Sequence, residues 1–155
     1  MTFEDLLARD GSLVYRTKGV SMEPMLRQDR DLVTIQVPET RLKKYDVALY
    51  KRGKDYVLHR VLGVKEGYYL IRGDNTFSME HVPEAAVIGV LTSFQRKSMV
   101  YSVTDRSYLC YVRIWCAIYP LRFLCNRCRR LAARLARKMG IHPLLKKLLG
   151  RDRGR

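Results

Sequence analysis

The sequence predicts a mainly β protein: an all-β barrel or sandwich with a short N-terminal helix and a basic amphipathic helical segment at the C-terminal end. Two observations carry this prediction. Up to about Thr104, short apolar segments alternate with turn residues at intervals of roughly eight to twelve residues, which is typical of antiparallel β folds. Beyond that point the apolar residues recur with a helical period among arginines and lysines.

The N-terminal helix is expected over residues 2–9. Thr2 is a suitable N-cap, because its hydroxyl can accept a hydrogen bond from a free backbone N–H of the first turn. Glu4 and Asp5 place negative charge at the positive end of the helix dipole. Gly11 then ends the helix.

Seven segments are expected to form strands, because each combines β-branched or aromatic residues with flanking turn signals. They are Ser12–Thr17, Asp31–Val37, Asp46–Lys51, Tyr56–Val64, Tyr68–Arg72, Val87–Phe94 and Met99–Val103. The short intervals between them favour an all-β barrel or sandwich over a parallel sheet of βαβ units.

The charge distribution divides the chain into two parts. Residues 1–104 contain 16 basic and 13 acidic residues, whereas residues 105–155 contain 14 basic and 2 acidic residues. Most of the net charge of +15 therefore lies in the last third. We expect a β domain over residues 1–104 and a basic helical tail over residues 105–155. Such a concentration of positive charge indicates an anionic partner, either nucleic acid or a membrane surface.

The tail is expected to form amphipathic helices over Asn126–Met139 and His142–Leu149. Between these helices and the β domain, Tyr108–Cys125 is rich in aromatic and aliphatic residues but is interrupted by Arg113 and Arg122. A membrane-spanning helix requires about 20 apolar residues with few or no charges. This segment therefore favours the surface of a membrane over its interior.

An anionic membrane surface is accordingly the expected partner of the segment Tyr108–Leu149. Its aromatic residues would lie at headgroup level: Tyr108, Tyr111, Trp115 and Tyr119. The competing interpretation is a helical hairpin packed on the β domain. Nucleic acid is disfavoured, because the leucine and aromatic content suits lipid better. The acidic N-terminus has no secretory signal, so we expect a peripheral protein on the cytoplasmic face of a membrane, and a cytoplasmic one otherwise. The sequence leaves the oligomeric state open.

All four cysteines lie in the tail. Cys125 and Cys128 form half of a zinc site, but further ligands would have to come from Cys110, Cys116 or His142 at unusual spacings. We therefore expect buried free thiols, without a metal, and no cofactor.

Two motifs of the β domain carry residues suited to nucleophilic catalysis. Ser21 lies in a glycine-containing loop before Met and Pro, which can present its hydroxyl on a fixed turn. His59 shares a strand face with Val57 and Val61, and burial among valines favours the neutral imidazole that a general base requires. Taken alone, each has a plainer interpretation: a surface turn, and a hydrogen-bonded core histidine.

The third motif, Arg72-Gly-Asp-Asn-Thr76, offers an acid that could orient His59. Its Gly-Asp-Asn is also ordinary turn chemistry. Asp74 is the first candidate, because a hairpin between the strand that ends at Arg72 and the His59 strand would bring its turn close. Glu80, six residues later, is the second. The residues alone leave both open, as well as a shared role.

Four short motifs resemble the boxes of type I signal peptidases in their order and spacing: Ser21-Met-Glu-Pro, Tyr45-Asp-Val-Ala-Leu-Tyr, His59-Arg-Val and Gly73-Asp-Asn. The resemblance covers roughly residues 12–94. With histidine at position 59, the chain is most similar to the branch found in archaea, the endoplasmic reticulum and some Gram-positive bacteria. The usual bacterial enzymes, and the related self-cleaving repressors, have lysine there.

This resemblance implies a serine endopeptidase on a coiled β fold, with Ser21 as nucleophile, His59 as general base and Asp74 or Glu80 as the orienting acid. It also implies an extended polypeptide substrate with small residues beside the cut, although the residues lining its pockets cannot be identified. Gly19 departs from the family, which often has an oxyanion-hole serine there. The oxyanion hole would then depend on backbone N–H groups, including that of Ser21.

We expect no counterpart of the N-terminal membrane anchor that is usual in the family. The alternative to a peptidase is a catalytically weak or inactive relative that binds a membrane surface or nucleic acid. No proposed catalytic residue lies in the tail, so its removal at residue 106 is expected to leave hydrolysis of a short peptide intact.

Overall fold

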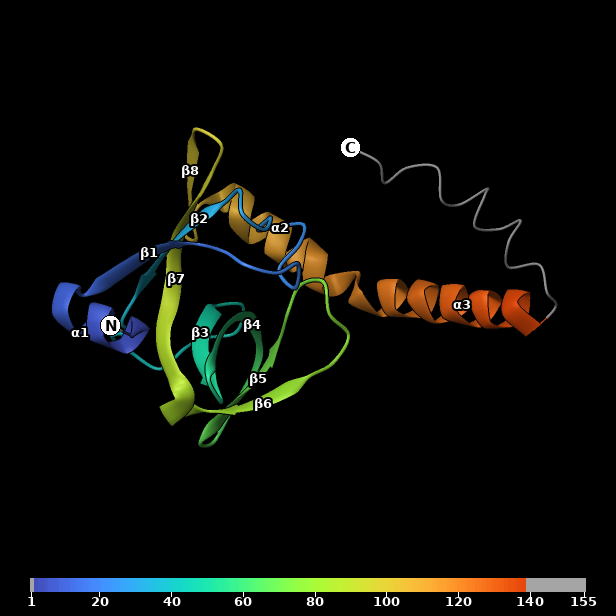
Figure 1. Ribbon diagram of the computed structural model, residues 1–155, viewed down its shortest axis with the longest axis horizontal. Coiled ribbons are helices and arrows are strands. Elements are labelled where there is room, and N and C mark those ends of the chain that lie inside the picture. Colours follow the sequence, from blue (N-terminus) through green and yellow to red (C-terminus); the bar gives the residue numbers. More distant parts are fainter. Residues whose placement is uncertain (1, 139–155) are drawn as a thin grey trace. The chain divides into compact units, whose positions relative to one another are not determined.

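The computed structural model describes residues 2–138 and contains three α-helices, one 3₁₀ helix and eight strands within that range (Figure 1). In chain order these are α1 (Phe3–Asp10), β1 (Ser12–Arg16), β2 (Leu32–Gln36), β3 (Val47–Arg52), β4 (Asp55–Lys65), β5 (Tyr68–Arg72), β6 (Glu80–Pro83), η1 (Glu84–Ala86), β7 (Val87–Arg96), β8 (Met99–Ser102), α2 (Arg106–Ala117) and α3 (Tyr119–Lys138). The chain divides into two compact units, Met1–Arg113 and the residues from Ile114 onward. The helix expected over residues 142–149 lies outside the described residues.

The eight strands form one antiparallel sheet in the order β1-β2-β7-β3-β4-β5-β6, with β8 paired to β7. The sheet coils strongly (Figure 1) but does not close. The prediction of a mainly β fold is therefore confirmed. Of the predicted barrel-like shape, the structure shows the coiling but not the closure. All seven expected strands are present. The eighth, β6, was not expected, because Glu-His-Val-Pro has neither alternation nor strong β propensity.

Strand β4 is the longest strand, and it changes partner along its length. Its first half, Asp55–Arg60, pairs with β3, whereas its second half, Arg60–Lys65, pairs with β5. Within the described residues no strand pairs with the outer edge of 55–59. This unpaired edge lies on the strand that carries His59.

The core of the sheet is built mainly from side chains that β3, β4, β5 and β6 direct to one face, joined by Leu42 from the loop before β3. The strand residues are Ala48, Tyr50, Val61, Tyr69, Ile71 and Val82. On β7, Gly89 packs so closely under Ile35 that a Cβ at Gly89 would lie 2.3 Å from Ile35 Cγ2. A larger residue at this position would therefore push β2 and β7 apart.

Helix α1 begins as expected. The Thr2 hydroxyl accepts a hydrogen bond from the Asp5 backbone N–H (3.2 Å), and the Asp5 carboxylate accepts one from the Thr2 N–H (2.8 Å), which completes a capping box. Glu4 pairs with Lys51 of β3 at 2.8 Å. The Phe3 ring stacks on Tyr56 with centroids 4.5 Å apart, which holds the helix against the start of β4.

The change from strands to helices falls where the sequence indicates it, between Ser102 and Arg106, but the first compact unit continues to Arg113. Tyr108 and Val112 of α2 are buried in that unit. Tyr108 therefore belongs to the core of the β unit, and the prediction that it lies at lipid headgroup level is wrong.

The helices α2 and α3 carry the four cysteines, which are free. Cys116 is partly buried and the other three are exposed, so the prediction of buried thiols is wrong. No group of three His, Cys, Asp or Glu side chains among residues 2–138 is placed to hold a metal ion, and His142 lies outside this range. None of the helices in the described part of the chain is long and apolar enough to cross a membrane.

Candidate active site

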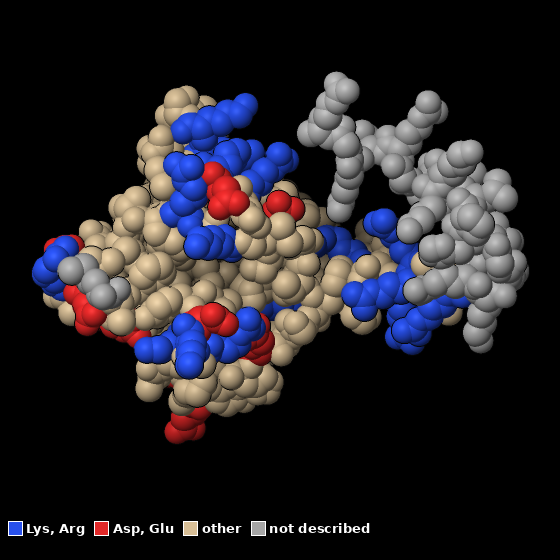
Figure 2. Space-filling model, in the orientation of Figure 1, with Lys and Arg blue, Asp and Glu red and all other residues tan. Residues whose placement is uncertain are grey.

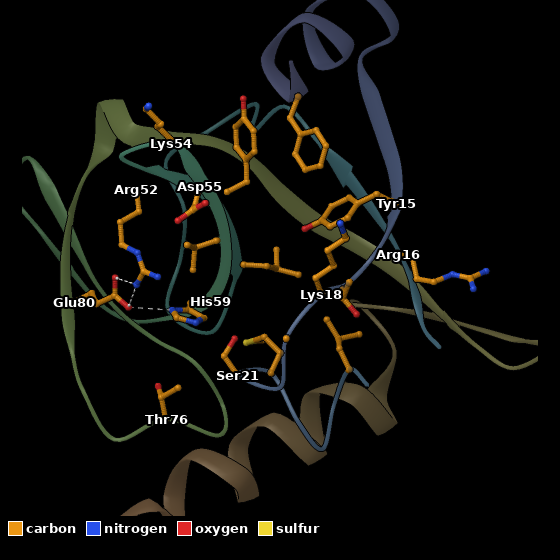
Figure 3. A pocket seen from close by; sticks show the side chains of 18 of the residues that line it. Tyr15, Arg16, Lys18, Ser21, Arg52, Lys54, Asp55, His59, Thr76 and Glu80 are labelled. Carbon is orange, nitrogen blue, oxygen red and sulfur yellow. Dashed lines mark hydrogen bonds and ion pairs between the residues drawn. The ribbon is translucent and has the colours of Figure 1, made fainter. Parts of the chain in front are cut away.

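A groove of about 810 Å³ opens on the β unit between the end of β1 and the first half of β4 (Figure 3). It contains three of the four residues singled out in the sequence: Ser21, His59 and Glu80. Asp74 does not line it. The other lining residues are Phe3, Tyr15, Arg16, Thr17, Lys18, Gly19, Met22, Leu26, Arg52, Lys54, Asp55, Tyr56, Val57, Leu58, Thr76 and Ser78.

Ser21 lies on a turn that is anchored by the buried apolar residues that follow it. Met22, Met25 and Leu26 are all buried, and the Leu26 N–H donates to the Met22 carbonyl at 3.0 Å. Gly19, which precedes the turn, has a φ of +82°, a conformation that glycine adopts without steric cost. The loop therefore holds Ser21 half-buried at the floor of the groove.

The turn after β5 holds the serine loop in place. The Asn75 backbone N–H donates to the Ser21 carbonyl at 2.8 Å, and the Asn75 side-chain amide donates to the Val20 carbonyl at 3.2 Å. A Cβ on Gly73 would lie 2.7 Å from the Ser21 carbonyl oxygen and 3.0 Å from His59 Nε2. Ser21 and His59 thus meet across Gly73, and only a residue without a side chain fits between them.

His59 is 5% exposed and is held through its other ring nitrogen. Nδ1 lies 3.2 Å from the Tyr50 hydroxyl and 3.4 Å from Glu80 Oε1, while Tyr50 donates its own hydroxyl proton to Glu80 Oε2 at 2.9 Å. A carboxylate only accepts hydrogen bonds, so the Tyr50 oxygen is left to accept one from Nδ1–H. We therefore assign the proton of the neutral imidazole to Nδ1, which leaves the lone pair of Nε2 on the side of Ser21.

Burial lowers the pKa of His59 below its usual value, and the negative charge of Glu80 partly opposes this effect. The positive charge of Arg52 lowers the pKa of His59 further, while the negative charge of Asp74 raises it. The imidazole is therefore uncharged at neutral pH and able to accept a proton.

Sheet register explains how Glu80 reaches His59. Glu80 pairs with Ile71 on β5, and Ile71 pairs with Val61 on β4. His59 is two residues from Val61, so the three strands present His59 and Glu80 on one face. Arg52 also contacts both Glu80 oxygens, at 3.2 and 3.3 Å.

Asp74 has a different role. The predicted hairpin between β4 and β5 is confirmed, with Arg60 opposite Arg72, but the turn brings Asp74 to Arg60 and not to His59. The two Asp74 oxygens accept from Arg60 Nε at 2.7 Å and from Arg60 Nη2 at 2.6 Å. Both side chains are buried. The acid adjacent to His59 is thus Glu80, and the preference for Asp74 from local pairing is not supported.

The remaining guanidinium donors of Arg60 are also satisfied. Nη1 donates to the Tyr45 carbonyl and to the Tyr108 hydroxyl, each at 3.0 Å, and Nη2 lies 3.0 Å from the sulfur of Met25. Arg60 therefore connects the serine loop, the Asp74 turn and helix α2. The sequence alone did not identify this role, because burial of an arginine can be inferred only when its partners are known.

No hydrogen bond joins the Ser21 hydroxyl to His59 within the described residues, although both line the same side of the groove (Figure 3). Catalytic hydrogen bonds commonly shorten only when substrate binds. The Ser21 backbone N–H makes no hydrogen bond to the described part of the chain, so it remains a candidate oxyanion donor in place of a side chain at Gly19.

Tyr50 and Arg52 were not among the expected site residues. Tyr50 occurs in the Tyr45–Tyr50 motif, and on a strand paired with β4 it shares the face of His59. The pairing of β3 with β4, once it is known, identifies Tyr50 as a residue of the site.

The groove combines a hydroxyl, a neutral imidazole and a carboxylate, which are the groups of a serine hydrolase. No protein-family model matches this chain, and no curated protein matches it significantly. The resemblance to type I signal peptidases therefore depends on the short motifs alone.

Proposed function

We propose that this protein is a serine endopeptidase similar to type I signal peptidases. One observation carries the proposal: Tyr50 and Glu80 hold His59 by Nδ1, while Nε2 faces the loop of Ser21 across Gly73. A purely structural role for His59 would not account for a serine that lines the same groove on the Nε2 side of the ring.

In the proposed reaction, His59 Nε2 takes the proton of Ser21 Oγ as the oxygen attacks the scissile carbonyl carbon. The resulting imidazolium then protonates the leaving amine as the C–N bond breaks, which leaves an acyl-enzyme on Ser21. Water then attacks the ester carbonyl as His59 Nε2 takes its proton, and the imidazolium returns that proton to Ser21 Oγ as the bond between the acyl carbon and Oγ breaks. Glu80 stabilises the imidazolium through Nδ1–H and holds the ring in the required tautomer.

The substrate class follows from the two unpaired strand edges beside the groove. Strand β1 pairs only with β2, and residues 55–59 of β4 pair only with β3, within the described residues. An extended polypeptide between these edges can form main-chain hydrogen bonds of the β type. Small residues beside the cut are implied by the family resemblance.

The second candidate, a catalytically weak or inactive relative, is favoured by one feature. Gly19 supplies no side-chain donor to the oxyanion hole, and loss of one such donor typically lowers kcat by about 100- to 1,000-fold. Activity-based labelling distinguishes a peptidase, whether fast or slow, from an inactive relative, because it requires an activated serine and not a fast turnover.

The purified full-length chain is treated with a fluorophosphonate probe, and the labelled residue is identified by peptide mass analysis. We expect labelling at Ser21 and its loss in Ser21→Ala. Ser78→Ala is the matched control, because Ser78 lines the same groove, and it should label normally. A folded wild-type chain that is not labelled, or labelling that persists in Ser21→Ala, would exclude the proposed peptidase.

A further inference from the structure

Helix α3 exposes a continuous apolar stripe. Leu121, Leu124, Leu131 and Leu135 are each at least half exposed, with values of 62%, 56%, 57% and 50%. Together with the exposed Cys128 they recur at alternating spacings of three and four residues. At about 100° per residue this spacing places all five on one arc of the helix. A water-exposed helix normally directs such a stripe towards a partner.

The opposite arc of α3 is basic. The helix contains seven basic residues and no acidic residue, and at about 100° per residue Arg122, Arg129, Arg130 and Arg134 lie away from the stripe, while Arg127 lies beside it. Figure 2 shows this as blue without red over α3 on the face in view. At the beginning of the helix, the Arg122 guanidinium lies 3.7 Å from the centroid of the Trp115 ring. An indole beside a cation suits the boundary between lipid and water.

These charges decide among the partners for the stripe. A second copy of the same helix would cover the leucines, but it would leave the basic arcs of both helices without an anionic partner. A spanning orientation is excluded for α3, because none of the described helices is long and apolar enough. A nucleic acid would neutralise the arginines but leave the leucines in water. An anionic bilayer satisfies both arcs, with leucines among the acyl chains and arginines among the headgroups.

We propose that α3 docks this protein on an anionic lipid bilayer, lying in the plane of the interface with its leucine stripe inward. The docking segment begins beyond Tyr108, which is buried in the β unit. The proposal is independent of the peptidase activity, since no residue of the groove belongs to α3.

The test is co-sedimentation of the full-length Ser21→Ala chain with vesicles. Phosphatidylcholine vesicles containing roughly one third phosphatidylglycerol should bind the chain, and pure phosphatidylcholine vesicles should bind it at least about tenfold more weakly. Raising the salt concentration from about 0.1 M to about 1 M should weaken binding to the anionic vesicles, because it screens the headgroup charge.

A pair of double variants separates the stripe from general charge. Leu124→Gln with Leu131→Gln removes two side chains of the stripe and should weaken vesicle binding at least about tenfold. Asn126→Gln with Ala133→Gln introduces the same residue on the opposite arc and should change binding less than about twofold. Circular dichroism confirms that both variants keep their helix content.

Three results would overturn the proposal. The first is a stripe variant that binds vesicles as well as the control variant does. The second is displacement of the chain from vesicles by duplex DNA, together with normal DNA binding by the stripe variant. The third is a lipid-free dimer that dissociates only in the stripe variant. The second result would identify a nucleic-acid surface, and the third an interface between copies.

Discussion

The ring of His59 is held by a hydroxyl and a carboxylate that are themselves hydrogen-bonded, at 2.9 Å from Tyr50 to Glu80. Both contacts favour the neutral tautomer of His59 that carries its proton on Nδ1. Loss of either partner leaves the other as an acceptor for Nδ1–H, so the ring orientation should survive a single substitution better than the catalytic rate does.

If this protein is the proposed peptidase, the pH dependence of its rate follows from the lowered pKa of His59. The base acts only when neutral, so kcat/KM should be constant near pH 8 and fall on acidification, with a midpoint below the usual value of 6.5. Glu80→Gln removes a charge that favours the imidazolium, so the midpoint should move to lower pH. Initial rates on a soluble peptide measure both curves. A profile that is flat down to pH 5 in both proteins would argue against a histidine base.

The two carboxylates should respond to substitution in opposite ways. Glu80→Gln should lower kcat by at least about tenfold, since Glu80 stabilises the imidazolium, with little effect on stability. Asp74→Asn should instead destabilise the fold by about 3–5 kcal/mol, because Arg60 is left buried without a counter-charge. Urea unfolding and peptide hydrolysis measure the two effects. A stable Asp74→Asn protein with low activity would return the catalytic role to Asp74.

At the scale of elements, the turn after β5 divides three tasks among three consecutive residues. Gly73 permits the close approach of Ser21 and His59, Asp74 pairs with Arg60, and Asn75 holds the serine loop. Each position of the Gly73-Asp-Asn motif is constrained by a different contact, which explains why so short a motif can be recognised in the sequence.

Gly73→Ala tests the close approach. The added methyl group would lie 2.7 Å from a backbone oxygen, so the serine loop or the His59 ring must move. Because a displacement near 1 Å can cost about 100-fold in rate, we expect a loss of that order in kcat/KM. The control is Gly67→Ala, whose positive φ of +76° strains the backbone without any atom within 4 Å of the new Cβ. It should lower the melting temperature and leave the rate unchanged. Equal rates in the two variants would contradict the close approach.

Strand periodicity and turn signals predict seven of the eight strands, and the capping pattern predicts α1, because both depend on neighbouring residues. The position of Glu80 depends instead on β6, whose sequence is not typical of a strand, and on a register across three strands. Local reasoning found the hairpin that carries Asp74, but it could not determine that the side chain reaches Arg60. Tyr108 was assigned to the tail by composition, although a single hydrogen bond to Arg60 fixes it in the β unit.

At the scale of the whole molecule, the position of Tyr108 changes the expected effect of truncation. Removal of residues 106–155 takes away a hydroxyl bonded to buried Arg60 and the buried side chain of Val112, so we expect a loss of roughly 2–5 kcal/mol of unfolding free energy. Removal of residues 118–155 keeps α2 and should leave hydrolysis of a short soluble peptide within about twofold of the full chain. Thermal unfolding and peptide hydrolysis of both truncated chains measure this. If the two were equally stable, α2 would be dispensable to the β unit.

Strand β4 carries His59 into the groove and Arg60 into the interior, as consecutive residues on opposite faces. A shift of this strand by a single position would exchange the two. The imidazole would then move away from Ser21 at the same moment as the Arg60 guanidinium lost its counter-ion. A copy with this misalignment would therefore lose both the proposed peptidase activity and much of its stability, so that any copy able to act is also a stably folded one.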